Sequence, residues 1–217
     1  MKKILILFSI LVFSANISFA DFMPRYTQHV KPNTIGVFNP PKSFIIYSEP
    51  DENSKPLEHI QWDKNGIIAN NNLNINENAL FIVYLSQKET AYCLVMDEID
   101  GWVQIYYPYT ENKKGWIKTT KENRFMPWIK FYMLFGRKNG VYFFKNMPEH
   151  NKQIKSGPSD DAQRISGFHY AKFVKMSLLR GNWMLVTIVD IGNEPKVGWI
   201  KWRNEDGTLM IFPNIDK

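Results

Sequence analysis

The sequence predicts an all-β protein built from small units of short strands. Runs rich in aromatic and β-branched residues recur along the chain, and such residues favour a pleated, half-buried surface. Turn residues separate these runs at short intervals, a spacing typical of small barrels and sandwiches. After residue 20, no stretch keeps apolar residues at helical spacing for three turns. The clearest strand patterns cover residues 43–47, 80–85, 102–106 and 141–144.

The first 20 residues have the pattern of a secretory signal peptide. Two lysines precede an apolar run over residues 4–13, and Ser18 and Ala20 place small residues at the −3 and −1 positions of a cleavage site. The apolar run is shorter than the roughly 20 residues that a spanning helix needs. We therefore expect an exported protein, periplasmic or extracellular, whose mature chain begins at Asp21. A short transmembrane anchor is the alternative interpretation.

An internal repeat follows in the rest of the chain. The sequence Gly-Trp-Ile-Lys occurs at residues 115–118 and again at 198–201. Upstream of each copy, a glycine turn leads into a strand that begins with a tryptophan, Trp102 in the first unit and Trp183 in the second. Each unit also opens with an apolar strand that runs into a proline-containing turn.

Two segments compete as the opening turn of the second unit. Residues 144–149, with Pro148, match residues 46–51 of the first unit and preserve the preceding apolar strand. Residues 155–159, with Pro158, match that turn more literally. The first register is favoured, because the difference in length then fits an Asn-rich stretch of the first unit, which has the composition of an inserted loop. Pro158 then belongs to a later turn.

This ordered set of motifs, present twice, resembles the bacterial SH3 domain. The resemblance covers roughly residues 42–120 and 140–203, and it implies two SH3-like small barrels in tandem behind a cleaved signal peptide. The expected organisation is a signal peptide at 1–20, an N-terminal arm at 21–41, a first barrel at 42–128 with an Asn-rich insertion at 63–78, an apolar joint at 129–139 and a second barrel at 140–217. The joint and its flanks are too apolar to be left in water, so we expect them to pack the barrels together.

Composition and motifs argue against an enzyme. The 217 residues include one cysteine, so an internal disulfide cannot form. Cys93 lies in a strand-like run with no helix after it, which favours a buried structural thiol over a nucleophile. The histidines are isolated and have no metal-ligand spacing; they are His29, His59, His150 and His169. We expect no catalytic residue, no metal site and no cofactor.

The charge is unevenly distributed. The net charge is +6, and the segment from residue 113 to 138 holds eight basic residues against the single acid Glu122. The basic residues are Lys113, Lys114, Lys118, Lys121, Arg124, Lys130, Arg137 and Lys138. Interleaved with aromatic residues, they suit an anionic polymer. Cell-wall polymers or anionic lipid head groups fit an exported protein better than nucleic acid does. A purely solvated basic face is the alternative.

Strand alternation places Trp102 and Trp183 opposite the core-filling residues of their strands. The resemblance to SH3 barrels implies an aromatic groove for peptides or glycans, and a tryptophan packed into the core is the alternative. The candidate ligand-binding residues are Tyr47, Trp102, Trp116, Lys118, Trp183, Trp199 and Lys201. The sequence thus predicts a non-catalytic exported binding module for a cell-wall peptide or glycan or an envelope protein. The alternative function is a structural interaction protein that docks a larger envelope complex.

Overall fold

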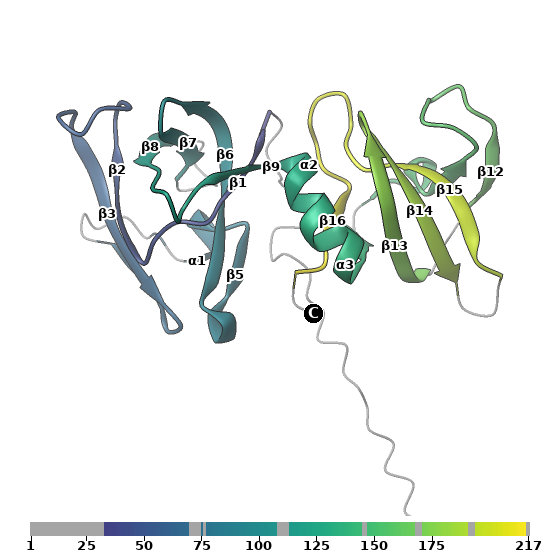
Figure 1. Ribbon diagram of the computed structural model, residues 1–217, viewed down its shortest axis with the longest axis horizontal. Coiled ribbons are helices and arrows are strands. Elements are labelled where there is room, and N and C mark those ends of the chain that lie inside the picture. The colour runs from purple at the N-terminus through teal and green to yellow at the C-terminus, as the bar shows by residue number, and fades with distance from the viewer. Residues whose placement is uncertain are drawn as a thin grey trace, which may run out of the picture.

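The computed structural model describes residues 33–69, 75, 77–107, 113–144, 147–167, 171–190 and 194–215. The predicted signal peptide at 1–20 lies outside the described residues. The described chain forms two sheets in which all named strand pairs are antiparallel, and this confirms the all-β prediction. Figure 1 shows the two sheets at opposite ends of the molecule, with short helices between them.

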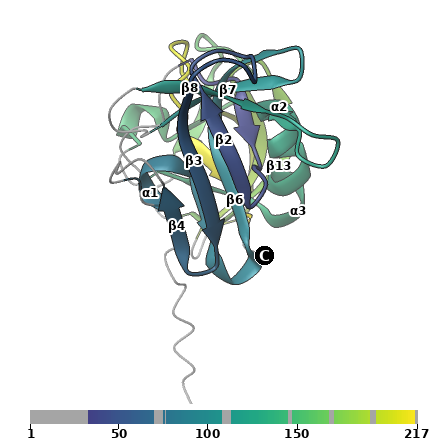
Figure 2. The same cartoon turned by 90° about the vertical axis from the view of Figure 1, so that its left-hand side faces the viewer.

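The first sheet has nine strands, and Figure 2 looks onto it. Its order is β4-β3-β2-β8-β7-β6-β1-β9, and β5 pairs separately with β6. The strands are β1 (Gly36–Phe38), β2 (Ser43–Tyr47), β3 (Pro56–Asp63), β4 (Gly66–Ala69), β5 (Val83–Leu85), β6 (Thr90–Ile99), β7 (Trp102–Tyr106), β8 (Lys114–Lys118) and β9 (Phe125–Pro127). Two short helical segments, α1 (Glu77–Leu80) and η1 (Ser86–Lys88), flank β5. Strand β1 comes from the segment that the sequence placed in the N-terminal arm.

The second sheet has seven strands in the order β12-β11-β15-β14-β13-β10-β16. They are β10 (Val141–Phe143), β11 (Gln153–Lys155), β12 (Arg164–Gly167), β13 (Ala171–Arg180), β14 (Trp183–Asp190), β15 (Lys196–Lys201) and β16 (Ile211–Pro213). A short 3-10 segment, η4 (Glu149–Asn151), lies between β10 and β11. The long hairpin of β13 and β14 carries two register shifts, at Ala171/Phe173 and at Met176/Leu178.

The two sheets repeat one topology. Strands β3, β2, β8, β7, β6, β1 and β9 follow one another in the first sheet as β12, β11, β15, β14, β13, β10 and β16 do in the second. The first unit adds β4, α1 and β5 between its third and fourth common strands. Part of the predicted Asn-rich insertion at 63–78 is therefore a strand, because β4 pairs with β3 in a hairpin.

Strand pairing overturns the favoured opening of the second unit. Tyr47 pairs with Trp116 in the first sheet, and Lys155 pairs with Trp199 in the second. Lys155 is therefore the counterpart of Tyr47, and the turn with Pro158 is the counterpart of the turn after β2. The prediction that Pro148 takes this place is wrong. The apolar strand before Pro148 is β10, which pairs with β13 and β16 and so occupies the position of β1.

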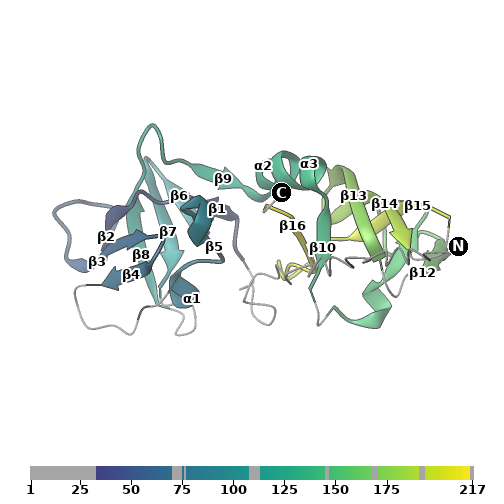
Figure 3. The same cartoon turned by 90° about the horizontal axis from the view of Figure 1, so that it is seen from below.

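A continuous helical segment joins the units, although the sequence predicted no helix. It consists of α2 (Trp128–Phe131), a π-helical turn η3 (Tyr132–Gly136) and α3 (Arg137–Asn139). Figure 3 shows it between the two sheets. Phe131 packs on Tyr92 of β6 with ring centroids 5.2 Å apart, and on Phe212 of β16 at 5.6 Å. One buried apolar cluster therefore runs from the first sheet through the helix into the second.

The remaining interior of the first unit is a separate cluster. Phe44 and Ile46 from β2, Val103 and Ile105 from β7 and Ile117 from β8 pack together there. Among the helices that the structure describes, none has the length and apolar character needed to cross a membrane.

Candidate functional site

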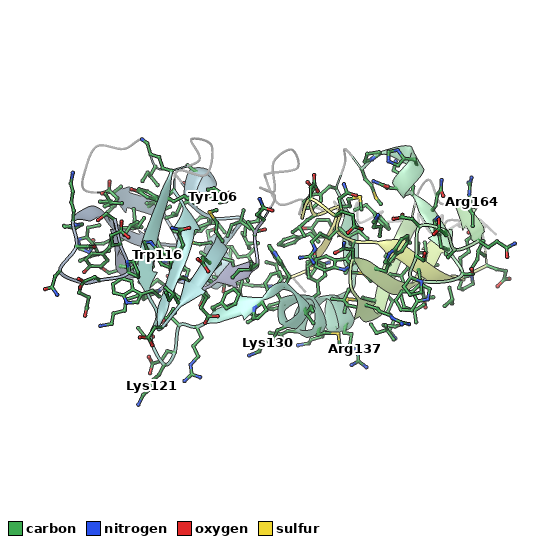
Figure 4. The ribbon with its side chains drawn as sticks, turned by 90° about the horizontal axis from the view of Figure 1, so that it is seen from above. Tyr106, Trp116, Lys121, Lys130, Arg137 and Arg164 are labelled. Carbon is green, nitrogen blue, oxygen red and sulfur yellow. The ribbon has the colours of Figure 1, made fainter. Side chains whose placement is uncertain are left out.

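Four of the predicted ligand-binding residues share the outer face of the first sheet. Trp102 of β7 stands opposite Lys118 of β8. Strand β8 pairs on its other edge with β2, where Trp116 stands opposite Tyr47. Directly opposed residues of an antiparallel pair project to the same side. The rings of Tyr47 and Trp102 meet edge to face, with centroids 5.5 Å apart. Trp116 is labelled in Figure 4.

The other three predicted residues form the corresponding set on the second sheet. Trp183 stands opposite Lys201, and Trp199 stands opposite Leu185 on the same face. The Lys201 Nζ atom lies 5.6 Å from the centroid of the Trp183 ring. Lys155 replaces Tyr47 here, so the second sheet lacks the tyrosine at this position. The seven residues thus form two sets, one on each sheet.

The tryptophans are more buried than a solvated groove requires. Trp102, Trp116 and Trp183 are each 8% exposed, and Trp199 is partly buried. For Trp102 and Trp183 this burial favours the alternative in which both tryptophans are packed over one in which they line a solvated groove. Tyr47 packs against Trp102, and the Lys201 ammonium lies over Trp183. In the first set, Lys118 is exposed and Tyr47 is partly exposed.

Both lysines of the Gly-Trp-Ile-Lys motif pair with an acid in the opening hairpin of their unit. Lys118 contacts Glu52 in the turn between β2 and β3. The Lys201 Nζ atom lies 2.7 Å from Asp160, in the turn between β11 and β12, and 3.4 Å from Glu205. Burial lowers the pKa of Lys201, but the two carboxylates outweigh burial and raise it. The Lys118 pair is solvent-exposed, so exchanging Glu52 for another anion costs little.

A groove of about 320 Å³ lies beside the first set. Ile45 and Tyr47 supply apolar surface, and Glu52 and Lys118 supply opposite charges. Ser43 and His59 add a hydrogen-bonded pair, with the Ser43 Oγ atom 2.9 Å from the His59 Nε2 atom. We take this groove as the candidate ligand site.

Of the groove residues described above, the sequence predicted only Tyr47 and Lys118, and it missed Ser43, Ile45, Glu52 and His59. His59 is isolated in the sequence because its partners come from β2, where it pairs with Ile45. Glu52 meets Lys118 across a separation of 66 residues. The one usable signal was the alternation of β2, which places Ser43, Ile45 and Tyr47 on one face.

A second hollow, of about 480 Å³, lies at the hairpin of β3 and β4. Trp62, Ile67 and Ile68 line it, and none of the predicted ligand-binding residues does. The Lys42 Nζ atom already covers the Trp62 ring at 3.7 Å from its centroid. This hollow is therefore the weaker candidate.

The thiol and the metal ligands can be judged directly. Cys93 is fully buried in β6, and burial raises the pKa of its thiol far above its usual value. This confirms the buried thiol expected from the sequence, since a nucleophilic cysteine needs the opposite shift. Within the described ranges, no group of three or more His, Cys, Asp or Glu side chains is arranged to hold a metal ion.

Comparison with known proteins found no matching family model, no matching curated protein and no matching solved structure. The resemblance to bacterial SH3 domains stays a prediction from the sequence. The fold is all-β, with one strand order present twice.

Proposed function

We propose that this protein is a non-catalytic binding module that takes an extended peptide or glycan chain in the groove of the first sheet. The observation that supports this function is the composition of the groove, with an apolar surface of Ile45 and Tyr47 between polar groups. Ligand sites characteristically combine apolar surface with a few convergent polar groups. A sugar ring or an apolar side chain would lie on Tyr47, whose ring packs edge to face with that of Trp102.

The polar groups would orient the chain. Ser43 and His59 offer donors and acceptors to a peptide bond or a sugar hydroxyl. Lys118 would bind a ligand carboxylate in exchange for Glu52, because their present ion pair is exposed. Cell-wall peptides and acidic glycans carry such carboxylates, so the envelope is the proposed location of the ligand.

Export forms part of the proposal. Cleavage after Ala20 would release a mature chain that begins at Asp21. Mass spectrometry of the protein from an envelope fraction should find Asp21 at the N-terminus. An intact Met1 in the membrane fraction would contradict export by this route.

The direct test is co-sedimentation of the chain from Asp21 onward with purified peptidoglycan sacculi. We expect Tyr47→Ala to weaken retention at least about tenfold, as loss of a central aromatic does at binding sites. Lys118→Gln should also weaken retention. Lys64→Gln removes the same charge from an exposed position outside the groove, and it should bind as wild type does. If wild type is not retained, or if Tyr47→Ala is retained equally, the groove does not bind cell-wall polymer.

A structural interaction protein is the second candidate function. Ile68 on β4 and Ile165 on β12 are strongly exposed, and both strands lie at sheet edges. Open edges and apolar side chains together suit pairing with a strand of another protein. A large complex in native envelope extracts, with no retention on sacculi, would favour this function.

A further inference from the structure

The helical segment 128–139 exposes one continuous face. Its opposite side is buried through Trp128, Phe131 and Tyr132. The outward-facing residues recur every four positions, and residues four apart lie in one row along a helix. Those rows are Ile129, Met133 and Arg137, beside Lys130, Leu134 and Lys138.

Aliphatic and basic side chains alternate on this face. Ile129 is 60% exposed and Leu134 is 51% exposed, although both are large apolar residues. Lys130, Arg137 and Lys138 are exposed around them. Such side chains remain in water at a cost unless another surface covers them.

The surroundings of this face are basic as well. Residues 123–144 contain four Lys and Arg residues and no Asp or Glu. Figure 4 shows Lys121, Lys130 and Arg137 projecting from the same side of the molecule, while Arg164 lies at the far end of the second sheet. The nearest acid along the chain is Glu122, whose carboxylate accepts a hydrogen bond from the Thr120 hydroxyl.

We infer that this face, residues 129–138, docks on the surface of an anionic lipid bilayer. Lys130, Arg137 and Lys138 would reach lipid phosphates, while Ile129 and Leu134 enter the boundary between head groups and acyl chains. Helices that lie in a membrane interface combine these two kinds of side chain. A soluble polyanion would use the cations alone and would leave the two aliphatic side chains in water. This inference is independent of the groove on the first sheet.

Vesicle flotation tests the inference with the chain from Asp21 onward. We use phosphatidylcholine vesicles with and without about one third phosphatidylglycerol. Wild type should float only with the vesicles that contain phosphatidylglycerol, and added salt should release it from them. The combined variant Lys130→Gln, Arg137→Gln and Lys138→Gln should partition roughly a hundredfold more weakly, because each cation at an anionic surface contributes about fivefold.

Two further variants make the test specific. Replacing Lys55, Lys64 and Arg164 with Gln removes the same charge from exposed positions outside the helix, and this control should keep most of the binding. The variant Ile129→Ser with Leu134→Ser keeps every charge, and it should lose about tenfold in vesicle binding. Its binding to dextran sulfate beads should equal that of wild type.

The opposite results overturn the inference. Equal binding to both kinds of vesicle would exclude a role for the cations. Undiminished vesicle binding by the serine variant would mean that the aliphatic side chains do not enter the bilayer. Binding to dextran sulfate but not to vesicles would assign the face to a soluble polyanion. Unchanged thermal melts of the variants show that each result concerns the surface and not the fold.

Discussion

Gly115 lies directly against Ile46: a Cβ atom on Gly115 would come within 2.3 Å of the Ile46 Cγ2 atom. The second unit has the same relationship, since a Cβ atom on Gly198 would come within 2.5 Å of the Ile154 Cγ2 atom. The glycine of each Gly-Trp-Ile-Lys copy is therefore required by the close approach of two neighbouring strands. These are β8 and β2 in the first unit, and β15 and β11 in the second. Packing of neighbouring strands therefore accounts for the repeated glycine without a ligand contact.

Gly115→Ala and Gly198→Ala should each lower the free energy of unfolding by about 3 kcal/mol. The added methyl group overpacks a buried site. On Gly115 it would clash with the side chains of Ile46 and Tyr107, and on Gly198 it would also come within 2.8 Å of the carbonyl oxygen of Lys155. Urea unfolding measures the loss. Gly157→Ala is the matched control, because its Cβ atom would make an ordinary 3.5 Å contact with Ala162. If all three variants unfold alike, the close approach does not constrain these positions.

Trp102→Ala and Trp183→Ala should each cost about 3 kcal/mol of stability, as truncation of a mostly buried aromatic does. Both rings are 8% exposed. This burial favours the packed alternative over an aromatic groove that stays solvated. Thermal melts measure the effect, and Trp199→Ala should cost less because Trp199 is only partly buried. If the first two variants melt as wild type does, the aromatic-groove interpretation is favoured instead.

Cys93 should resist thiol reagents at neutral pH in the native protein. Its side chain is fully buried, and burial holds the pKa of the thiol far above its usual value, so the reactive thiolate is scarce. Labelling in denaturant should be fast and serves as the control. Cys93→Ser should cost about 1–3 kcal/mol, since it buries a hydroxyl in an apolar site. Rapid native labelling would show that β6 opens readily.

Tyr142→Phe should leave stability unchanged or raise it slightly. The Tyr142 hydroxyl is buried and has no hydrogen-bond partner among the residues that the structure describes. Removing an unsatisfied buried polar group removes its desolvation cost. Tyr132→Phe is the contrasting variant, because the Tyr132 hydroxyl donates to the carbonyl oxygen of Ile211. We expect that variant to lose about 1 kcal/mol, and an equal loss in both would contradict the assignment.

Stability should fall steeply in alkali. Burial raises the pKa of both Tyr132 and Tyr142 well above the usual 10.0. Below this value both tyrosines are protonated in the folded and unfolded chains, so stability is fully present. Above it only the unfolded chain loses the protons, and each tyrosine should cost about 1.4 kcal/mol per pH unit. Urea unfolding at rising pH measures how fast the free energy of unfolding falls with pH. Tyr142→Phe should reduce this slope by the contribution of one tyrosine.

The sequence predicted the repeat because its markers are tryptophans and glycines with strict packing roles. It did not predict the register of the second unit. Strand β11 has three residues, of which only Ile154 is buried, so its composition carries almost no strand signal. The more apolar β10 was therefore predicted as the opening strand of the second unit, although its pairing matches that of β1.

The helical segment was missed for a related reason. Ile129 and Leu134 are exposed, so apolar residues lie on both sides of the helix and the helical period is blurred. In the groove, Lys118 could be predicted from the repeat, and Tyr47 from the strand pattern of residues 43–47. His59 could not be predicted, because the pairing of β3 with β2 brings it there. Glu52 could not be predicted either, because it lies in the turn after β2 and meets Lys118 only in the folded chain.

The position of Phe131 has a consequence for how the protein unfolds. Its ring contacts Tyr92 of the first sheet and Phe212 of the second, so a single side chain belongs to the interiors of both repeats. Unfolding of either sheet would remove the partners of the helix on that side and expose aromatic surface on the repeat that remains folded. The boundaries of the repeat therefore do not coincide with the boundaries of cooperativity. We expect a chain cut between the repeats to yield two incomplete fragments, and the intact chain to melt in a single transition.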